Sequence, residues 1–159
     1  MYNGGMLVSK NKKAYFEGEV LEKYMAGIVL KGYEVKALKE GKVNFDSSYV
    51  QFIGNELFVV NMYIGRFTNQ SQEVSEQSMR RSRKLLLNQR EIEQVRRDLQ
   101  ERGKTVVPLA MLLEHNLIKL EFGIMKGRKK TEKKHIEKEK QIKRDLERDT
   151  KEFRRANSQ

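Results

Sequence analysis

The chain of 159 residues contains no cysteine and no tryptophan, one proline and two histidines. Without cysteine it can form no disulfide and carry out no thiol chemistry, and a reducing compartment is compatible with this composition. Long apolar runs are also missing, because the longest, Val106–Leu113, is interrupted by the proline. A helix that spans a membrane needs about 20 apolar residues. We therefore expect no membrane-spanning segment.

Several functional classes lack the residues that they need. The segment MYNGGMLVSKNKKAYF has no long apolar stretch of the type found in signal peptides. His115 and His135 lie in a predicted turn and in a charged segment, and no group of histidines and cysteines has metal-ligand spacing. GKVNF lacks the Gly-x4-Gly-Lys-Ser/Thr pattern of a phosphate-binding loop. We expect a cytoplasmic protein that is not an enzyme and uses no metal, cofactor or small-molecule substrate.

Positive charge is abundant and unevenly distributed. The net charge is +11, and residues 126–159 contain 14 Lys and Arg against 7 Asp and Glu, which places +7 of this charge in that segment. A basic chain with a still more basic end indicates a polyanionic partner, with RNA or DNA first. A membrane surface is a weaker alternative, because the segment has too few apolar residues for firm insertion.

The first half of the chain is predicted to be mostly β-structure. Residues 14–31 mix aromatic and β-branched residues with polar ones, as strands do, and Gly27 indicates a bend or bulge. Residues 32–41 favour a short helix between two glycines. Residues 43–64 predict a hairpin with its turn at Gly54-Asn55.

In the second half, a polar loop at 65–78 precedes a long predicted helix, residues 79–102, which Gly103 would end. The apolar face of this helix would consist of Leu85, Ile92, Val95 and Leu99. Two strands follow around a turn near His115-Asn116, with Pro108 at an edge or a strand start. Several strands with an inserted helix favour a mainly β fold with helices, in the form of a small barrel or a strongly curled sheet.

The basic cluster RRSRK, Arg80–Lys84, opens the predicted long helix. The helix macrodipole is positive there, so each cation costs roughly a few tenths of a kcal/mol. Two interpretations stay open: a solvated face screened by salt, or a surface that binds phosphates. Lys36, Lys39 and Lys42 lie in or just after the short helix and could form a second wall of the same groove. Lys119 is expected to point out of the last strand.

Residues 126–159 form a tail that cannot build a core of its own. Ile142, Leu146 and Phe153 would share one face of a helix, and two Glu–Lys pairs at i,i+4 would add less than about 1 kcal/mol. That is too little to hold an isolated helix against its nucleation cost. We expect the tail to be disordered when free and helical when bound to an anionic partner, with an inert solubilising tail as the alternative.

Six motifs occur in a characteristic order and spacing: NKKA at 11–14, AGIVLKGYEVKALKEGKVNF at 26–45, DSSYV at 46–50, RKLLLNQREI at 83–92, VVPL at 106–109 and GIMKGRKK at 123–130. In this order they resemble the SsrA-binding protein family, also called small protein B, the partner of tmRNA in bacterial trans-translation. The resemblance implies an oligonucleotide-binding-type β-barrel with flanking helices at 1–125, followed by the basic C-terminal tail at 126–159.

The same resemblance implies the partners. The barrel would bind the tRNA-like domain of tmRNA, also called SsrA RNA, and bring it to a stalled ribosome. The tail would become helical in the empty mRNA path, near the decoding centre of the small-subunit rRNA. In this complex the protein would be monomeric and would contact no membrane.

The resemblance implies RNA contacts for Glu34, Lys36, Lys84, Leu86 and Lys119. With the basic residues singled out above, the predicted set for the tRNA-like domain is Glu34, Lys36, Lys39, Lys42, Arg83, Lys84, Leu86 and Lys119. The predicted set for the ribosome is Gly127, Arg128, Lys129, Lys130, Glu132, Lys133 and Lys134. The chain departs from the family pattern at Phe16, at Met25, where an acidic residue is usual, and at Glu132-Lys133-Lys134.

Two other functions remain as alternatives. One is a general RNA-binding or ribosome-associated module of the same barrel class, without specificity for tmRNA. The other is a helical scaffold whose tail binds a protein. Phosphate contacts make affinity fall steeply with salt, whereas a protein partner of the tail would not.

Overall fold

The computed structural model describes residues 6–71, 73–127 and 141–144. The chain divides into two compact units, Met1–Gly127 and Arg128–Gln159. In the second unit residues 141–144 are described, and they are α-helical. The other expectations for the tail, including the roles of Arg128, Lys129, Lys130, Glu132, Lys133 and Lys134, fall outside the described residues.

Strands dominate the first unit, with helices between them. In chain order the described elements are β1 (Met6–Lys10), α1 (Lys12–Glu17), β2 (Gly18–Ile28), α2 (Gly32–Lys39), β3 (Val43–Asn44), β4 (Tyr49–Ile53), β5 (Glu56–Val60), β6 (Tyr63–Ile64), α3 (Glu76–Met79), β7 (Arg83–Leu86), α4 (Gln89–Leu99), β8 (Lys104–Glu114) and β9 (Leu117–Gly127).

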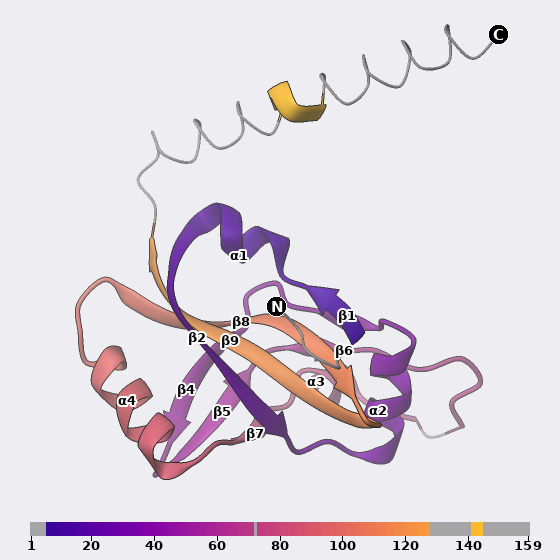
Figure 1. Ribbon diagram of the computed structural model, residues 1–159. Coiled ribbons are helices and arrows are strands. Elements are labelled where there is room, and N and C mark those ends of the chain that lie inside the picture. The colour runs from indigo at the N-terminus through magenta and orange to yellow at the C-terminus, as the bar shows by residue number, and fades with distance from the viewer. Residues whose placement is uncertain (1–5, 72, 128–140, 145–159) are drawn as a thin grey trace, which may run out of the picture. The chain divides into compact units, whose positions relative to one another are not determined.

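Seven strands form one antiparallel sheet in the order β1-β8-β9-β2-β7-β5-β4, and β3 pairs with β6. The sheet curls until β4 lies close to β8. Figure 1 shows β4, β5 and β7 lying beneath the long β8–β9 hairpin. Because no ladder joins β4 to β8 in the described part of the chain, the barrel stays open. The predicted fold class, a mainly β barrel of the oligonucleotide-binding type with flanking helices, is confirmed.

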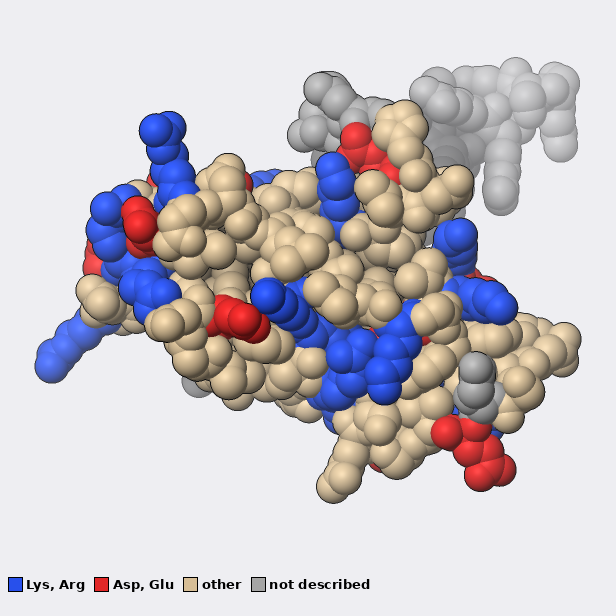
Figure 2. Space-filling model, turned by 90° about the horizontal axis from the view of Figure 1, so that it is seen from below, with Lys and Arg blue, Asp and Glu red and all other residues tan. Residues whose placement is uncertain are grey.

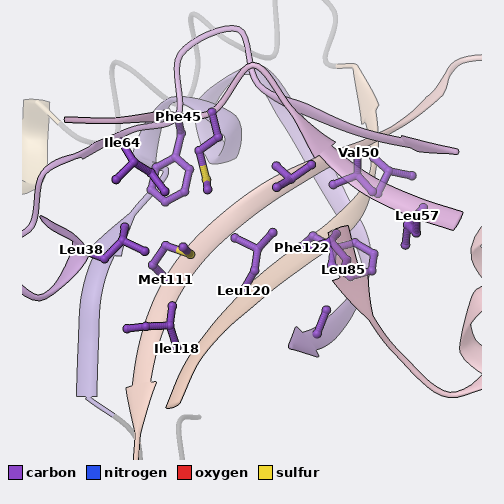
Figure 3. Close-up of a cluster of buried hydrophobic side chains, with 14 of the residues drawn as sticks. Leu38, Phe45, Val50, Leu57, Ile64, Leu85, Met111, Ile118, Leu120 and Phe122 are labelled. Carbon is purple, nitrogen blue, oxygen red and sulfur yellow. The ribbon is translucent and has the colours of Figure 1, made fainter. Parts of the chain in front are cut away.

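The core fills the inside of this curled sheet (Figure 3). Alternate residues of β9 point inward, among them Ile118, Leu120 and Phe122, and each is at most 8% exposed. Tyr24 of β2 stacks on Phe122 with ring centroids 5.5 Å apart. Leu38 brings α2 into the same cluster. Each fully buried side chain of this kind contributes about 1.5–3 kcal/mol, so the burial of this cluster inside the curled sheet stabilises the fold.

Three predicted elements are confirmed. The helix predicted at 32–41 is α2, and the hairpin predicted at 43–64 is β4–β5, with Gly54 at φ +64° in its turn. The last two strands are β8 and β9. Their turn places His115 at φ 48° and Asn116 at φ 64°, which is the backbone of a tight type I′ hairpin turn.

The prediction of one long helix at 79–102 is wrong in its first half. Residues Arg83–Leu86 form strand β7, and α4 begins at Gln89 behind Asn88, whose side chain accepts the Glu91 amide hydrogen at 2.9 Å. In β7, Arg83 and Leu85 are buried, while their neighbours are more exposed, as alternation in a strand requires. The sequence did not reveal this strand, because the charged residue Arg83 occupies an inward position. Leu85 also has helical spacing from the apolar residues of α4, and this spacing favoured the prediction of one long helix.

The electrostatic cost predicted for the cations of RRSRK does not arise, because these residues do not open a helix. In α4 the acidic Glu91 lies in the first turn and the basic Arg96 and Arg97 lie in the last turn. This is the distribution that a helix dipole favours. The cations of RRSRK lie instead on α3's end and on β7, where no dipole acts against them.

The N-terminal strand prediction also begins too early. Ala14–Glu17 belongs to α1, which Asn11 caps by accepting the Ala14 amide hydrogen at 3.2 Å. The irregularity expected at Gly27 occurs instead between Val20 and Glu22. The loop expected at 65–78 ends in the short helix α3.

Pro108 lies inside β8 but beyond Ala110, where the pairing of β8 with β1 ends, so at this position β8 has an edge on that side, as predicted. Its strand pairs with β9, and the register shifts between Pro108 and Ala110. The skipped residue is Leu109, whereas Pro108 itself pairs with Phe122. The Pro108 carbonyl faces away from β9, so the missing N–H group faces away as well and the β8–β9 ladder loses no hydrogen bond. On the other side, the Asn11 side chain donates to the Pro108 carbonyl at 2.8 Å.

Gly123 of β9 provides a test of how tightly the sheet packs. A Cβ there would lie 2.7 Å from Cδ1 of Leu109 and 3.0 Å from the carbonyl oxygen of Glu22. We expect Gly123→Ala to lower the free energy of unfolding by about 1–3 kcal/mol because of this overpacking. The measurement is urea denaturation, with Gly32→Ala as the control because a Cβ at Gly32 meets nothing within 4 Å. Equal stability of the two variants would contradict the prediction.

Candidate nucleic-acid interface

A buried ion pair between α2 and β7 underlies the basic surface. Arg83 is 0% exposed and Glu34 is 2% exposed, and Nε of Arg83 donates to Oε2 of Glu34 at 2.6 Å. The other Arg83 nitrogens donate to the carbonyls of Met62 at 2.6 Å and Met79 at 2.9 Å. A buried charge has to be paired and hydrogen-bonded, and this one is. Arg83 therefore presents no free surface to a nucleic acid in this structure.

Glu34 completes the site from the first turn of α2. Its Oε1 accepts the Lys31 amide hydrogen at 2.8 Å and also bonds to the Arg81 guanidinium. Burial opposes ionisation of this carboxyl, but the bonds from Arg81 and Lys31 and the charge of Arg83 outweigh it and hold the pKa of Glu34 below its ordinary value. Glu34 thus stays an anion and holds two arginines beside α2.

Two basic side chains lie over aromatic rings of residues 63–67, which comprise β6 and the three residues after it. Arg80 lies over the Tyr63 ring at 5.2 Å, and Lys36 lies over the Phe67 ring at 5.2 Å. Between these rings, the Gly65 amide hydrogen bonds to the Lys42 carbonyl at 2.9 Å. We call Lys36, Lys39, Lys42, Arg80 and Arg81 the basic strip. Figure 2 shows Lys and Arg side chains gathered near the middle of the face seen from below.

A second group of predicted residues lines an open depression on the outer face of β9, β2 and β7. Its lining is Met25, Ala26, Gly27, Leu86, Leu87, Asn88, Glu91 and Lys119. Gly27 pairs with Lys119 on one side and with Leu86 on the other, so the three positions form one row across the sheet. Met25 is 39% exposed and Leu86 is 51% exposed. The depression offers apolar contact beside an amine and an amide.

Lys119 and Lys84 each carry a carboxylate partner. Nζ of Lys119 lies 3.4 Å from Glu114, and Nζ of Lys84 lies 3.3 Å from Glu56. All four side chains are at least 31% exposed, and ion pairs of this kind contribute about 0–1 kcal/mol. A phosphate can therefore replace either carboxylate at little cost.

The structure thus divides the predicted RNA-binding set. Lys36, Lys39 and Lys42 belong to the strip, whereas Leu86 and Lys119 belong to the depression. Glu34 and Arg83 lie beneath the strip as its buried support. Gly127 ends β9 and pairs with Gly18.

Sequence reasoning missed two aromatic residues, Tyr63 and Phe67, because the sequence around an aromatic residue gives no sign of the cation that covers its ring. Their alternation around Gly65 was the available signal.

Among residues 6–71, 73–127 and 141–144, no group of three or more His, Cys, Asp or Glu side chains could hold a metal ion. The helices within these ranges include none that is long and apolar enough to cross a membrane.

The Glu34 site predicts a large and pH-dependent effect on stability. Glu34→Gln leaves Arg83 buried without its counter-charge, which costs about 3–5 kcal/mol of unfolding free energy at neutral pH. Because the folded-state pKa of Glu34 lies below its ordinary 4.5, the carboxylate stabilises the fold above that pH. This contribution is lost as the pH falls through the lowered pKa.

Urea denaturation at a series of pH values measures this effect. The gap between the parent protein and Glu34→Gln should be widest near neutral pH and should narrow below about pH 4.5. The control is Glu56→Gln, which removes the exposed partner of Lys84 and should cost under about 1 kcal/mol. A gap that stays constant from neutral to acid pH would show that ionised Glu34 is not what holds Arg83.

Comparison with known proteins bears on this surface. The model of the family described as SmpB protein matches residues 8–152. The SsrA-binding protein of Treponema denticola is 38% identical over 145 residues, covering 91% of this chain and 93% of its own. That of Flavobacterium johnsoniae is 42% identical over 141 residues, covering 87% and 91%.

A solved structure is similar as well. It is described as "tmRNA-SmpB: a journey to the center of the bacterial ribosome", and one of its chains matches with a TM-score of 0.65 at 36% identity. The match covers 77% of this chain and 85% of that one. The curled sheet, the motif order and the matched length agree, and the chain belongs to the SmpB family of SsrA-binding proteins.

Proposed function

We propose that this protein binds the tRNA-like domain of tmRNA and brings it to stalled ribosomes in trans-translation. The observation that carries the proposal is the depression in which exposed Met25 and Leu86 meet Lys119 and Asn88. Relatives that match most of the chain are named SsrA-binding proteins, and the similar solved chain belongs to a tmRNA–SmpB structure on the ribosome. Such a protein works in the cytoplasm and performs no catalysis itself.

The depression suits an RNA that presents unpaired bases. Apolar side chains and the bare backbone of Gly27 allow a base or sugar to approach closely, and the Asn88 amide and the Lys119 amine supply hydrogen-bond donors. Proteins recognise structured RNA mainly at loops, where bases are splayed out of the helix. Lys84, on the outward side of β7 next to Leu86, adds a phosphate contact at the edge.

The C-terminal tail serves a different step in this proposal. Its basic residues, from Gly127 through Lys134, would enter the empty mRNA path near the decoding centre, where a helix forms on binding. Support comes from the +7 charge of residues 126–159 and from the helical residues 141–144. Ordering upon binding lets one segment use its contacts only on the correct partner.

Binding to a tRNA-like fragment of tmRNA across a salt series, with elongator tRNA as competitor, tests the proposal. The expected result is tight binding that falls steeply with salt and resists competition by tRNA. Binding that any tRNA displaces would instead favour a general RNA-binding module. An affinity for the fragment that does not change with salt would argue against phosphate contacts and would favour the alternative in which the tail binds a protein.

Leu86→Ala tests the depression directly. Removing the exposed isobutyl group should weaken binding to the tRNA-like fragment about 5–30-fold, because roughly 1–2 kcal/mol of apolar contact is lost. The matched control is Ile53→Ala, since Ile53 is 47% exposed on β4 and lies outside the depression. Equal affinities of the two variants, measured by fluorescence anisotropy, would exclude the depression as the binding site.

Truncation after Gly127 tests the division of labour. The compact unit Met1–Gly127 keeps all of β9, so binding to the tRNA-like fragment should stay largely intact. Peptide tagging on ribosomes stalled at the end of a message should be abolished. The outcome that contradicts this prediction is a truncated protein that loses fragment binding together with tagging while its circular dichroism spectrum shows that it is still folded. The tail could then not be a separate functional part.

A further inference from the structure

We propose that three carboxylates select the RNA that binds at the depression. Glu56 and Glu114 repel an RNA that offers only phosphates, and together with Glu91 they accept hydrogen bonds from the bases and sugar hydroxyls of an RNA that fits. This role rests on the proposed function, because it concerns RNA held at that same site.

The depression and its margin are not basic. Lys119 and Glu91 are the charged residues of its lining, and their charges cancel. At the margin, Lys84 and Glu56 form a neutral pair, while Glu114 beside Lys119 adds a negative charge. Two lysines and three glutamates give a local charge of −1, in a chain whose net charge is +11. A site that attracted RNA through its charge alone would have the opposite sign.

Glu114 lies diagonally across the β8–β9 hairpin from Lys119. Lys119 pairs with Leu112, and Glu114 is two residues further along β8, on the same face of the sheet. Its carboxylate is 3.4 Å from Nζ of Lys119. Diagonal neighbours on one face are within reach of long side chains. Glu114 therefore holds the amine that borders the depression.

A second pair with the same geometry lies toward β5. Lys84 pairs with Phe58, and Glu56 is two residues before Phe58 on the same face of β5. Nζ of Lys84 lies 3.3 Å from the Glu56 carboxylate. Lys84 and Leu86 share the outward face of β7. A lysine with its own acid thus lies at each end of the row that crosses the sheet at the depression.

A phosphate by itself is a poor ligand for a lysine held in this way. The exposed ion pair costs little to break, but the released carboxylate stays close to the phosphate that takes its place. Two anions at such a distance repel each other. An RNA whose unpaired bases do not reach the depression offers it mainly phosphates, so the two acids lower the affinity of that RNA.

Unpaired bases give the released carboxylates new partners. An ionised carboxylate only accepts hydrogen bonds, and the exocyclic amines of bases and the 2′-hydroxyl donate them. Glu91 lines the depression from the first turn of α4, and the Asn88 side chain accepts its backbone amide hydrogen at 2.9 Å. This cap fixes the start of the helix. Glu91 is therefore presented to the RNA from a rigid element.

The alternative is that the two ion pairs only stabilise the sheet. Exposed pairs contribute little to folding, and a purely structural role would leave the choice between two RNAs unchanged. The ratio of two RNA affinities therefore separates these roles.

The test compares two double variants of the full chain that change its charge equally. Glu56→Gln/Glu114→Gln removes the acids that hold the two lysines. Glu17→Gln/Glu19→Gln is the control and removes two exposed acids at the end of α1 and the start of β2. A general gain in attraction for RNA appears in both. Circular dichroism and thermal unfolding should show that both variants are folded.

Affinities for elongator tRNA and for the tRNA-like fragment are measured across a salt series. Glu56→Gln/Glu114→Gln should bind elongator tRNA roughly 10–30-fold more tightly than the control does. Its slope of log K against log salt should be steeper, by up to about 0.9 for each lysine that gains a phosphate. For the fragment the two variants should agree within about threefold, because new phosphate contacts offset lost hydrogen bonds. The preference for the fragment should therefore fall.

Glu91→Gln tests the contact with bases separately. It should weaken fragment binding about 3–10-fold, because a hydrogen bond to an ionised acceptor is replaced by a neutral one. Binding of elongator tRNA should not weaken. The thermal unfolding midpoint serves as the control for the start of α4.

Three outcomes overturn the proposal: equal changes in the two double variants, a gain by Glu56→Gln/Glu114→Gln that is the same for both RNAs, or fragment binding that Glu91→Gln leaves unchanged. Failure of the parent protein to prefer the fragment over elongator tRNA would instead refute the proposed function. The gain in affinity for elongator tRNA over the control would still measure the repulsion by Glu56 and Glu114, so the two failures are distinguishable.

Discussion

The ion pair of Glu34 and Arg83 is the interaction on which the rest of the molecule depends. It joins α2 to β7 and, through the carbonyls of Met62 and Met79, joins both to the β5–β6 connection and to α3. Removing either partner would leave a charge in a place that water does not reach. The pair therefore commits four neighbouring elements to one arrangement, which apolar packing alone would specify less sharply.

The surface above this pair inherits its order. Arg81 shares the carboxylate of Glu34, and α2 is fixed at its first turn by the same side chain. The lysines of α2 and the arginines before β7 consequently lie on a rigid base rather than on a mobile loop. Sites built on fixed elements hold their geometry better than sites on loops. The depression has a comparable base, because Gly27 lies inside the sheet, paired with Lys119 of β9 on one side and with Leu86 of β7 on the other.

Much of the fold could be predicted from local signals. Glycine and asparagine at the two hairpin turns, and the two glycines around α2, each have a direct backbone meaning. Strand β7 could not, because its inward arginine is stable only when Glu34, 49 residues away, is in place. The candidate site divides in the same way. The exposed lysines followed from sequence, but the burial of Arg83 and the rings beneath Lys36 and Arg80 depend on tertiary contacts.

The order of strands in the sheet has a consequence for how the protein is made. β1 and β2 find their partners in β8 and β9, which are synthesised about a hundred residues later, as the contact between Asn11 and Pro108 illustrates. Such long-range pairing slows folding, since loop closure precedes any reward. During synthesis the first strands emerge with unpaired edges and stay exposed to other nascent chains until the last hairpin follows. A protein of the ribosome's rescue system is thus itself vulnerable to incomplete translation, because a chain that stops before residue 104 lacks both strands needed to complete the sheet.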